Sequence, residues 1–114
     1  MSKVKRVEKN NFVAIVATKD ILKGELVHTL VGKILLKRNK HSIQIGKNEH
    51  IMDEIGMFIN HSFDPNVEIV YRGIIALEKI KIGEEITFNY LNNEDHIFSP
   101  FKCKHTGRWV KKDA

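Results

Sequence analysis

The stretch that decides the fold is Met57-Phe58-Ile59-Asn60-His61-Ser62-Phe63-Asp64-Pro65-Asn66. Its first three residues are apolar and can sit in a core, and amide, imidazole and hydroxyl side chains follow at positions 60–62. Pro65 fixes its own φ and Asn66 tolerates a left-handed turn, so the chain bends stiffly after these polar groups. Buried polar groups need partners in the protein or in a ligand. The stretch therefore predicts either a loop that satisfies its own hydrogen bonds or a binding corner.

Around this stretch, length and composition set the limits. The chain has 114 residues, of which 42% are hydrophobic, so we expect one compact domain over residues 1–114 with a single core. The formal net charge is +5, but the basic residues are scattered in small groups, which argues against a dedicated nucleic-acid groove. A single cysteine, Cys103, excludes an internal disulfide and a zinc site built from thiolates alone.

The sequence also bears on where the protein acts. It contains no apolar run approaching the length of a membrane span, and its start lacks the apolar segment of a secretion signal. We therefore expect an intracellular protein without a membrane partner. The cytoplasm is the predicted compartment, and the nucleus stays open as an alternative.

The rest of the chain has the pattern of short strands separated by glycine turns. We expect a short helical turn within 49–58 and a loop from residue 92 onward, with almost no other helix. The residues of 41–46 alternate polar and apolar, as in a half-exposed strand, and Ile86, Phe88 and Tyr90 would share one face of a final strand. The expected strands are 4–8, 12–17, 25–31, 41–46, a hairpin of 66–71 and 73–77 turning at Arg72-Gly73, and 85–90.

Four pieces of sequence then occur in an informative order. They are 17–25 (Ala-Thr-Lys-Asp-Ile-Leu-Lys-Gly-Glu), Asn60-His61-Ser62 with Pro65-Asn66, 83–90 (Gly-Glu-Glu-Ile-Thr-Phe-Asn-Tyr), and Phe101-Lys102-Cys103. Their order and spacing resemble the SET-domain family of protein-lysine methyltransferases over residues 12–103. The resemblance implies a mostly β, SET-domain-like (β-clip) fold of several small sheets. In that fold the Asn60 and Tyr90 segments meet in a knot-like crossing, and residues 92–114 form a covering segment.

The resemblance also implies a site. Asn60 and His61 match family residues that hold S-adenosylmethionine on one face of the domain. Tyr90 matches a catalytic residue that lines a narrow channel, which the lysine of a protein substrate enters from the other face. Phe88, two residues earlier, is then expected on the channel wall.

The chemistry of methyl transfer explains why such residue types are needed. Transfer from a sulfonium to an amine is an in-line displacement, so the two reacting atoms must be held close and aligned. The lysine must be neutral, and deprotonating an amine of pKa near 10.4 at pH 7 costs roughly 4 to 5 kcal/mol unless the site lowers that pKa. An apolar channel beside a positive sulfonium lowers it, and a tyrosine hydroxyl can orient the amine. Tyr90 could alternatively be a strand tyrosine that anchors the sheet.

The chain departs from the family pattern near the expected cofactor. The family carries Gly-x-Gly before the position of Ala17, whereas this chain has Phe12 and Ala14 there. Ala14 is still expected to line the cofactor site, but each Cβ restricts how closely the backbone can approach a ligand. Asn89 stands where the family often has Asp.

The zinc cluster of many family members is also missing from the pattern. Phe63 occupies the place of the cysteine after Asn-His-Ser, and the tail has only Cys103. We therefore predict no metal site. Phe98, Phe101 and Trp109 could instead cover the cofactor and complete the channel, or they could be ordinary core cover.

Three functions from different classes follow. The favoured one is an S-adenosylmethionine-dependent protein-lysine N-methyltransferase. The second is a catalytically weak or inactive SET-like interaction module, which the lost glycines would allow. The third is a small basic β-domain that binds nucleic acid, which is disfavoured because no row of aromatic residues alternates with Lys and Arg.

Overall fold

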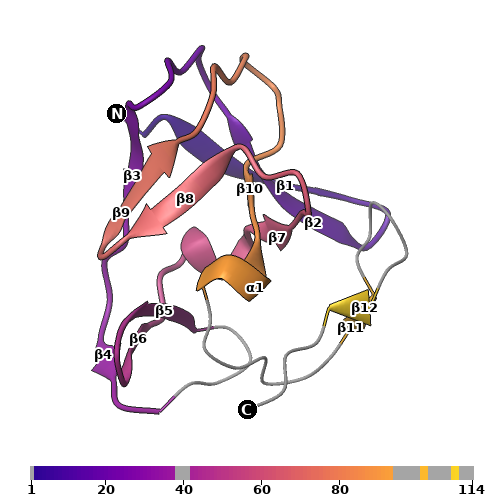
Figure 1. Cartoon of the computed structure of the whole chain (residues 1–114). Helices are drawn as coiled ribbons and strands as arrows, with labels where there is room; N and C mark the ends of the chain where they lie inside the picture. Colours follow the sequence, from indigo (N-terminus) through magenta and orange to yellow (C-terminus); the bar gives the residue numbers. More distant parts are fainter. Residues whose placement is uncertain (1, 38–41, 94–100, 103–108, 111–114) are drawn as a thin grey trace.

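The structure is a computed structural model that describes residues 2–37, 42–93, 101–102 and 109–110, with side chains described over 2–37 and 42–91. Its elements are short strands with very little helix (Figure 1). The helical elements are the single 3-10 turn η1 (Gly56–Phe58) and α1 (Tyr90–Asn93). The strands are β1 (Val4–Lys9), β2 (Phe12–Ala17), β3 (Leu26–Thr29), β4 (Ile34–Leu35), β5 (Ile43–Gly46), β6 (Glu49–Ile51), β7 (Asn60–His61), β8 (Val67–Val70), β9 (Gly73–Ala76), β10 (Thr87–Phe88), β11 (Phe101–Lys102) and β12 (Trp109–Val110).

The strands form several small sheets rather than one large one. Two sheets have three strands, in the orders β3-β9-β8 and β4-β6-β5, and three have two strands, β1-β2, β7-β10 and β11-β12. All pairs are antiparallel except β7 with β10. The predicted mostly β fold of several small sheets is confirmed.

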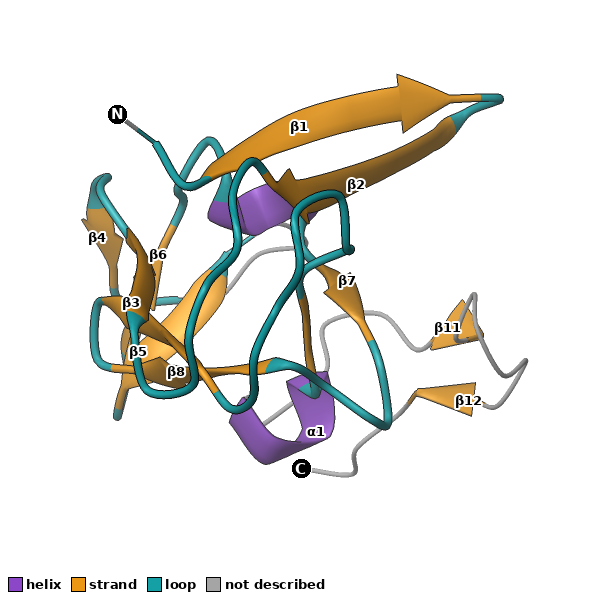
Figure 2. Cartoon of the chain, turned by 90° about the horizontal axis from the view of Figure 1, so that it is seen from above, coloured by secondary structure: helices purple, strands orange, loops and turns teal. Residues whose placement is uncertain are grey.

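The predicted hairpin of β8 and β9 forms, β1 and β2 form a second hairpin, and left-handed residues lie in both turns. Asn10 and Asn11 have φ of 51° and 64°, which is the geometry of a two-residue hairpin turn between β1 and β2. This hairpin runs along one edge of the molecule (Figure 2). Tyr71, with φ of 53°, begins the turn between β8 and β9, so the turn lies one residue earlier than the predicted Arg72-Gly73.

The core is dominated by isoleucine. The described strands have two to six residues and none buries more than three side chains, so the core is assembled from many elements. A large aliphatic side chain is worth roughly 1.5 to 3 kcal/mol when fully buried, so these single contributions add up across the sheets. The largest completely buried side chains are Ile15, Ile21, Leu30, Ile51, Ile59, Ile74, Ile80, Ile86 and Val67.

Two expectations for the middle of the chain need correction. The strand at 41–46 is confirmed as β5, but it is not half-exposed, because Gln44 is buried between Ile43 and Ile45. Its side-chain amide donates to the carbonyl of Gly46 at 3.2 Å, which reduces the cost of that burial. The range 49–58 holds the strand β6 as well as the expected helical turn, η1.

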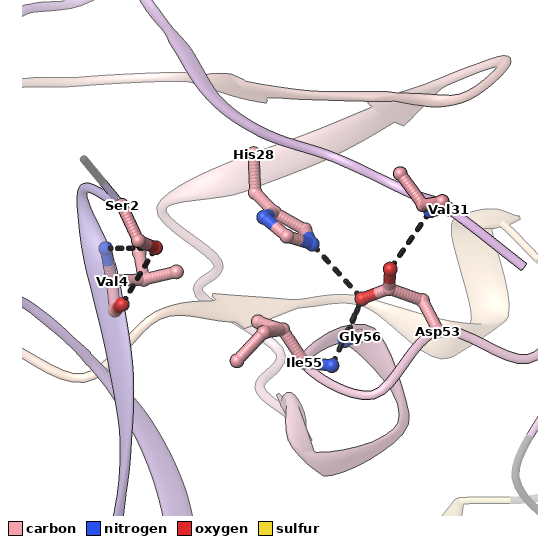
Figure 3. Close-up of polar contacts among 7 residues, drawn as sticks. All are labelled: Ser2, Val4, His28, Val31, Asp53, Ile55 and Gly56. Atoms are coloured by element: carbon pink, nitrogen blue, oxygen red, sulfur yellow. Dashed lines mark hydrogen bonds and ion pairs between the residues drawn. The ribbon is translucent and has the colours of Figure 1, made fainter.

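A buried carboxylate links β3 to η1. Asp53 Oδ2 accepts hydrogen bonds from His28 Nε2 at 2.9 Å and from the backbone N–H groups of Ile55 and Gly56 at 2.9 and 2.7 Å (Figure 3). Asp53 Oδ1 accepts the N–H of Val31 at 2.8 Å. Burial raises the pKa of Asp53, but the hydrogen bonds, first that from His28, outweigh it and lower the pKa to about 2. The carboxylate therefore holds the turn that leads into Asn60.

The last predicted strand is shorter than expected. Only Thr87 and Phe88 form β10, and Tyr90 is the first residue of α1 rather than the end of a strand. The side chain of Asn89 accepts the N–H of Leu91 at 2.9 Å, which satisfies one of the free donors at the start of the helix. Local capping by Asn89 thus overrides the strand-like alternation of Ile86, Phe88 and Tyr90.

Candidate functional site at the crossing of β7 and β10

The crossing predicted for the Asn60 and Tyr90 segments is present. β7 and β10 pair in parallel, with Thr87 opposite Asn60 and Phe88 opposite His61. The N–H of Ser62 donates to the carbonyl of Phe88 at 3.1 Å and extends the pairing. Two segments far apart in the sequence are thereby held side by side beneath the β1–β2 hairpin (Figure 1).

Asn66 fastens this crossing with its side chain. Its Nδ2 donates to the carbonyl of Glu85 at 2.7 Å, and its Oδ1 accepts the N–H of Thr87 at 2.9 Å. Its own N–H donates to the carbonyl of Thr87 at 3.2 Å. The side chain therefore satisfies two backbone groups of the opposite segment. From its place after Pro65, only a turn role was expected for Asn66.

Asn60 points its amide nitrogen into the protein. Nδ2 donates to the carbonyl of Val13 at 2.9 Å and to Oε2 of Glu85 at 2.8 Å. Both N–H groups are thus used, and within the described side chains Asn60 Oδ1 accepts no hydrogen bond. Asn60, which is partly exposed, consequently offers an acceptor to a ligand. The neighbouring carboxylate of Glu85 was missed by the sequence analysis, although the pair Glu84-Glu85 before a buried isoleucine was a visible signal.

Tyr90 is held at both ends by the segment that contains β7. Its backbone N–H donates to Nδ1 of His61 at 3.0 Å, and its hydroxyl donates to the carbonyl of Ile59. Its ring centroid lies 4.6 Å from that of Phe88 and 5.2 Å from that of His61. The structure therefore brings Asn60, His61, Phe88 and Tyr90 together at one crossing.

Phe12 and Ala14, which stand where the family pattern has glycine, both lie on β2 (Phe12–Ala17), the strand whose Val13 contacts Asn60. Ala14 is 3% exposed, so its Cβ is buried, while the carbonyl of the preceding Val13 contacts Asn60. Phe12 is half-buried at the start of β2, opposite Lys9. The predicted role of Ala14 in cofactor binding stays a prediction.

A pocket of about 300 Å³ lies between β8 and β10. Phe88 and Asn89 form its wall on the side of the crossing, and one carboxylate, that of Glu68, is among its lining groups. Neither Asn60 nor Tyr90 lines it. Its other lining residues are Pro65, Val67, Ile69 and Leu77.

Two predictions concern features that the described residues test only in part. Among those residues, no three His, Cys, Asp or Glu side chains are grouped so that they could hold a metal ion, and no helix is long and apolar enough to cross a bilayer. Cys103 and Phe98 lie outside the described residues, and for Phe101 and Trp109 only the backbone, in β11 and β12, is described. The absence of zinc and the covering role of these aromatic residues stay predictions.

Comparison with known proteins identifies the class of this fold. The model of the SET domain matches residues 12–91, which is well over half of the chain. The chain therefore belongs to the SET-domain family, and the sequence-based resemblance is confirmed.

A curated relative and two solved structures agree with this assignment. The Variant-silencing SET domain-containing protein of Plasmodium falciparum is 35% identical over an alignment of 131 positions, which covers 88% of this chain but only 5% of that protein. The structure of a humanized mutant of Chaetomium thermophilum Polycomb Repressive Complex 2, bound to an inhibitor, has a TM-score of 0.64 at 18% identity, covering 96% of this chain and 19% of that one. KRYPTONITE in complex with mCHG DNA and SAH has a TM-score of 0.66 at 21% identity, covering 88% and 26%. At these identities the solved structures establish the fold.

Proposed function

We propose that this protein is an S-adenosylmethionine-dependent methyltransferase that modifies a lysine of a protein substrate. The observation that carries the proposal is the double attachment of Tyr90, whose N–H and hydroxyl both donate to the segment bearing Asn60 and His61. The structure of KRYPTONITE contains SAH, the form of the cofactor that has lost its methyl group, and supports this choice of cofactor.

The groups at the Asn60 corner fit a cationic cofactor. When bound, S-adenosylmethionine supplies a methyl group activated by a positive sulfonium, and it also carries an ammonium group. Asn60 offers Oδ1 as an acceptor, because its Nδ2 is used by Val13 and Glu85, and the Glu85 carboxylate adds a negative charge beside it. We assign Asn60, Ala14 and His61 to the cofactor site, and His61 contributes through its backbone, because its imidazole is turned toward the N–H of Tyr90.

Tyr90 is suited to orienting a neutral amine. Because its hydroxyl proton is donated to the carbonyl of Ile59, the phenol oxygen can meet an amine only as an acceptor of an amine N–H. An amine that donates to this oxygen keeps its lone pair free for attack. A phenol that instead donated to the amine would occupy that lone pair. The Ile59 carbonyl thus sets the direction of the hydrogen bond that Tyr90 makes to the substrate.

Phe88 lowers the polarity next to Tyr90. It is 4% exposed, and its ring lies against that of Tyr90. A lysine placed beside this apolar pair loses hydration, which disfavours its charged form and lowers its pKa. We therefore assign Phe88 and Tyr90 to the substrate channel, with Tyr90 as the catalytic residue.

The proposal is tested by cofactor titration and methyl transfer. Calorimetry of the parent chain with S-adenosylmethionine should give a Kd in the micromolar range, and labelled cofactor should transfer methyl groups to basic proteins. Tyr90→Phe should keep cofactor binding and lose most of the turnover, on the order of 10²-fold, because the amine is no longer oriented.

Tyr71→Phe is the matched control. Tyr71 is 56% exposed in the turn between β8 and β9, so removal of its hydroxyl should change neither binding nor turnover. No heat with millimolar cofactor would reject the proposal and favour an interaction module. Equal turnover for Tyr90→Phe and the parent would show that Tyr90 is not the catalytic residue.

A further inference from the structure

We infer that the side chain of His61 is a positioning residue for Tyr90 and acts on methyl transfer through that tyrosine, so that only the backbone of His61 faces a cofactor. The inference rests on the proposed function for its catalytic consequence. Its structural part, the contact between the imidazole and Tyr90, stands on the geometry of the crossing.

The imidazole is turned toward α1. His61 is 3% exposed, and its Nδ1 accepts the N–H of Tyr90 at 3.0 Å. Tyr90 is the first residue of α1, where backbone N–H groups have no partner within the helix. The side-chain Oδ1 of Asn89 accepts a hydrogen bond from the N–H of Leu91 at 2.9 Å. The imidazole of His61 and the side-chain oxygen of Asn89 thus accept the first two N–H groups of α1 and together fix where this helix begins.

This contact specifies the chemical form of His61. An imidazole nitrogen that accepts a hydrogen bond carries no proton, so the ring has its proton on Nε2. A side chain that replaces His61 must therefore present an acceptor at the position of Nδ1, one bond beyond Cγ. Asparagine has its Oδ1 there, whereas the acceptor of glutamine lies one atom further out, near the position of Nε2.

The ring also fills the space beside Tyr90. Its centroid lies 5.2 Å from the Tyr90 ring at an interplanar angle of 71°, and 4.5 Å from the Phe63 ring at 86°. Such edge-to-face contacts favour one ring orientation. Phe63 and Tyr90 thus both pack against the imidazole.

Two attachment points from one segment then define the position of Tyr90. His61 holds its backbone and the Ile59 carbonyl holds its hydroxyl, and these two residues are separated only by Asn60. The same segment therefore carries the cofactor acceptor and the two groups that place the phenol. Loss of the imidazole contact frees the backbone of Tyr90, and a small displacement of the phenol is enough to slow an in-line transfer.

The experiment compares H61N with H61Q in the full chain. Both remove the aromatic ring, but only H61N returns an acceptor to the Nδ1 position. We expect single-turnover methyl transfer in H61Q to fall about 10- to 100-fold, with the cofactor Kd within about threefold of the parent, and H61N to lose distinctly less rate than H61Q. Equal losses in the two variants, or a loss explained by a weaker cofactor Kd, would overturn the inference.

A second readout does not depend on activity. In the parent, a scalar coupling across the hydrogen bond should join the Tyr90 amide nitrogen to His61 Nδ1, and the Tyr90 amide should exchange about three- to tenfold faster in H61Q than in H61N. Absence of the coupling overturns the role of His61, whether or not the variants fold. Absence of methyl transfer by the parent, with the coupling present, overturns the proposed function alone.

Discussion

Asn66 shows how one side chain can replace a stretch of sheet. Its amide donates to the Glu85 carbonyl and accepts from the Thr87 N–H, as a paired backbone would. In Asn66→Asp the donor becomes a carboxylate oxygen that faces the Glu85 carbonyl. We expect the free energy of unfolding, measured by urea titration, to fall by about 1 to 3 kcal/mol, because a part-buried carbonyl loses its hydrogen-bond donor.

The control for Asn66 is the same change at an exposed turn. Asn48, with φ of 58°, lies between β5 and β6, where Asp tolerates the left-handed conformation almost as well. Asn48→Asp should alter stability by no more than about 0.5 kcal/mol. If both variants unfold at the parent's urea midpoint, the side chain of Asn66 does not fasten the crossing.

Glu85 sets the charge of the proposed cofactor corner. In Glu85→Gln an amide oxygen can still accept from Asn60 Nδ2, which the parent places 2.8 Å from Oε2, so the corner should keep its shape while losing a negative charge. A cationic cofactor should then bind about fivefold more weakly, corresponding to about 1 kcal/mol. The difference in cofactor Kd between Glu85→Gln and the parent should shrink at high salt, because salt screens the attraction between the carboxylate and the cationic cofactor.

Calorimetry at low and high salt measures this effect. Glu84→Gln removes the adjacent but exposed carboxylate and should leave the cofactor Kd close to that of the parent. Identical Kd values for Glu85→Gln and Glu84→Gln would show that proximity to Asn60 gives Glu85 no special role.

At the scale of elements, the sequence predicted strands well where local chemistry dominates. The run Phe12–Ala17 is rich in β-branched residues and forms β2, and the alternation around 66–77 forms the hairpin of β8 and β9. Errors occurred where a neighbour decides the outcome. Gln44 is buried because the backbone supplies its partner, and the start of α1 depends on the caps from His61 and Asn89. Period-two alternation alone cannot reveal such caps.

At the scale of the whole molecule, the crossing itself was predictable only from the resemblance of ordered motifs. Once that resemblance is accepted, the pairing of the Asn60 segment with the Tyr90 segment follows. The contacts that hold the site were not predictable, because Asn60 with Glu85 and His28 with Asp53 are each 25 residues apart. No local period connects residues at such a distance, so only the fold reveals that these side chains meet.

The buried carboxylate of Asp53 gives the whole molecule a pH-dependent stability. It joins β3, the segment at Val31 and the turn η1 through hydrogen bonds to His28 and to the N–H groups of Val31, Ile55 and Gly56. Its pKa is lowered from 3.8 to about 2 in the folded chain. A lowered pKa contributes stability above the unfolded value, and this contribution, about 2 kcal/mol, is lost as pH falls from about 4 through 2.

Urea unfolding of the parent and of Asp53→Asn between pH 7 and pH 2 tests this link. The variant should be less stable by about 2 kcal/mol or more at pH 7, because an amide cannot accept all four donors that surround Asp53. The gap should narrow below pH 4, where the parent carboxylate begins to take up a proton. Asp64→Asn, at an exposed position of the corner after His61, should follow the parent at every pH. A constant gap between the parent and Asp53→Asn down to pH 2 would mean that the charge of Asp53 does not stabilise the fold, and that its four contacts act only as neutral hydrogen bonds.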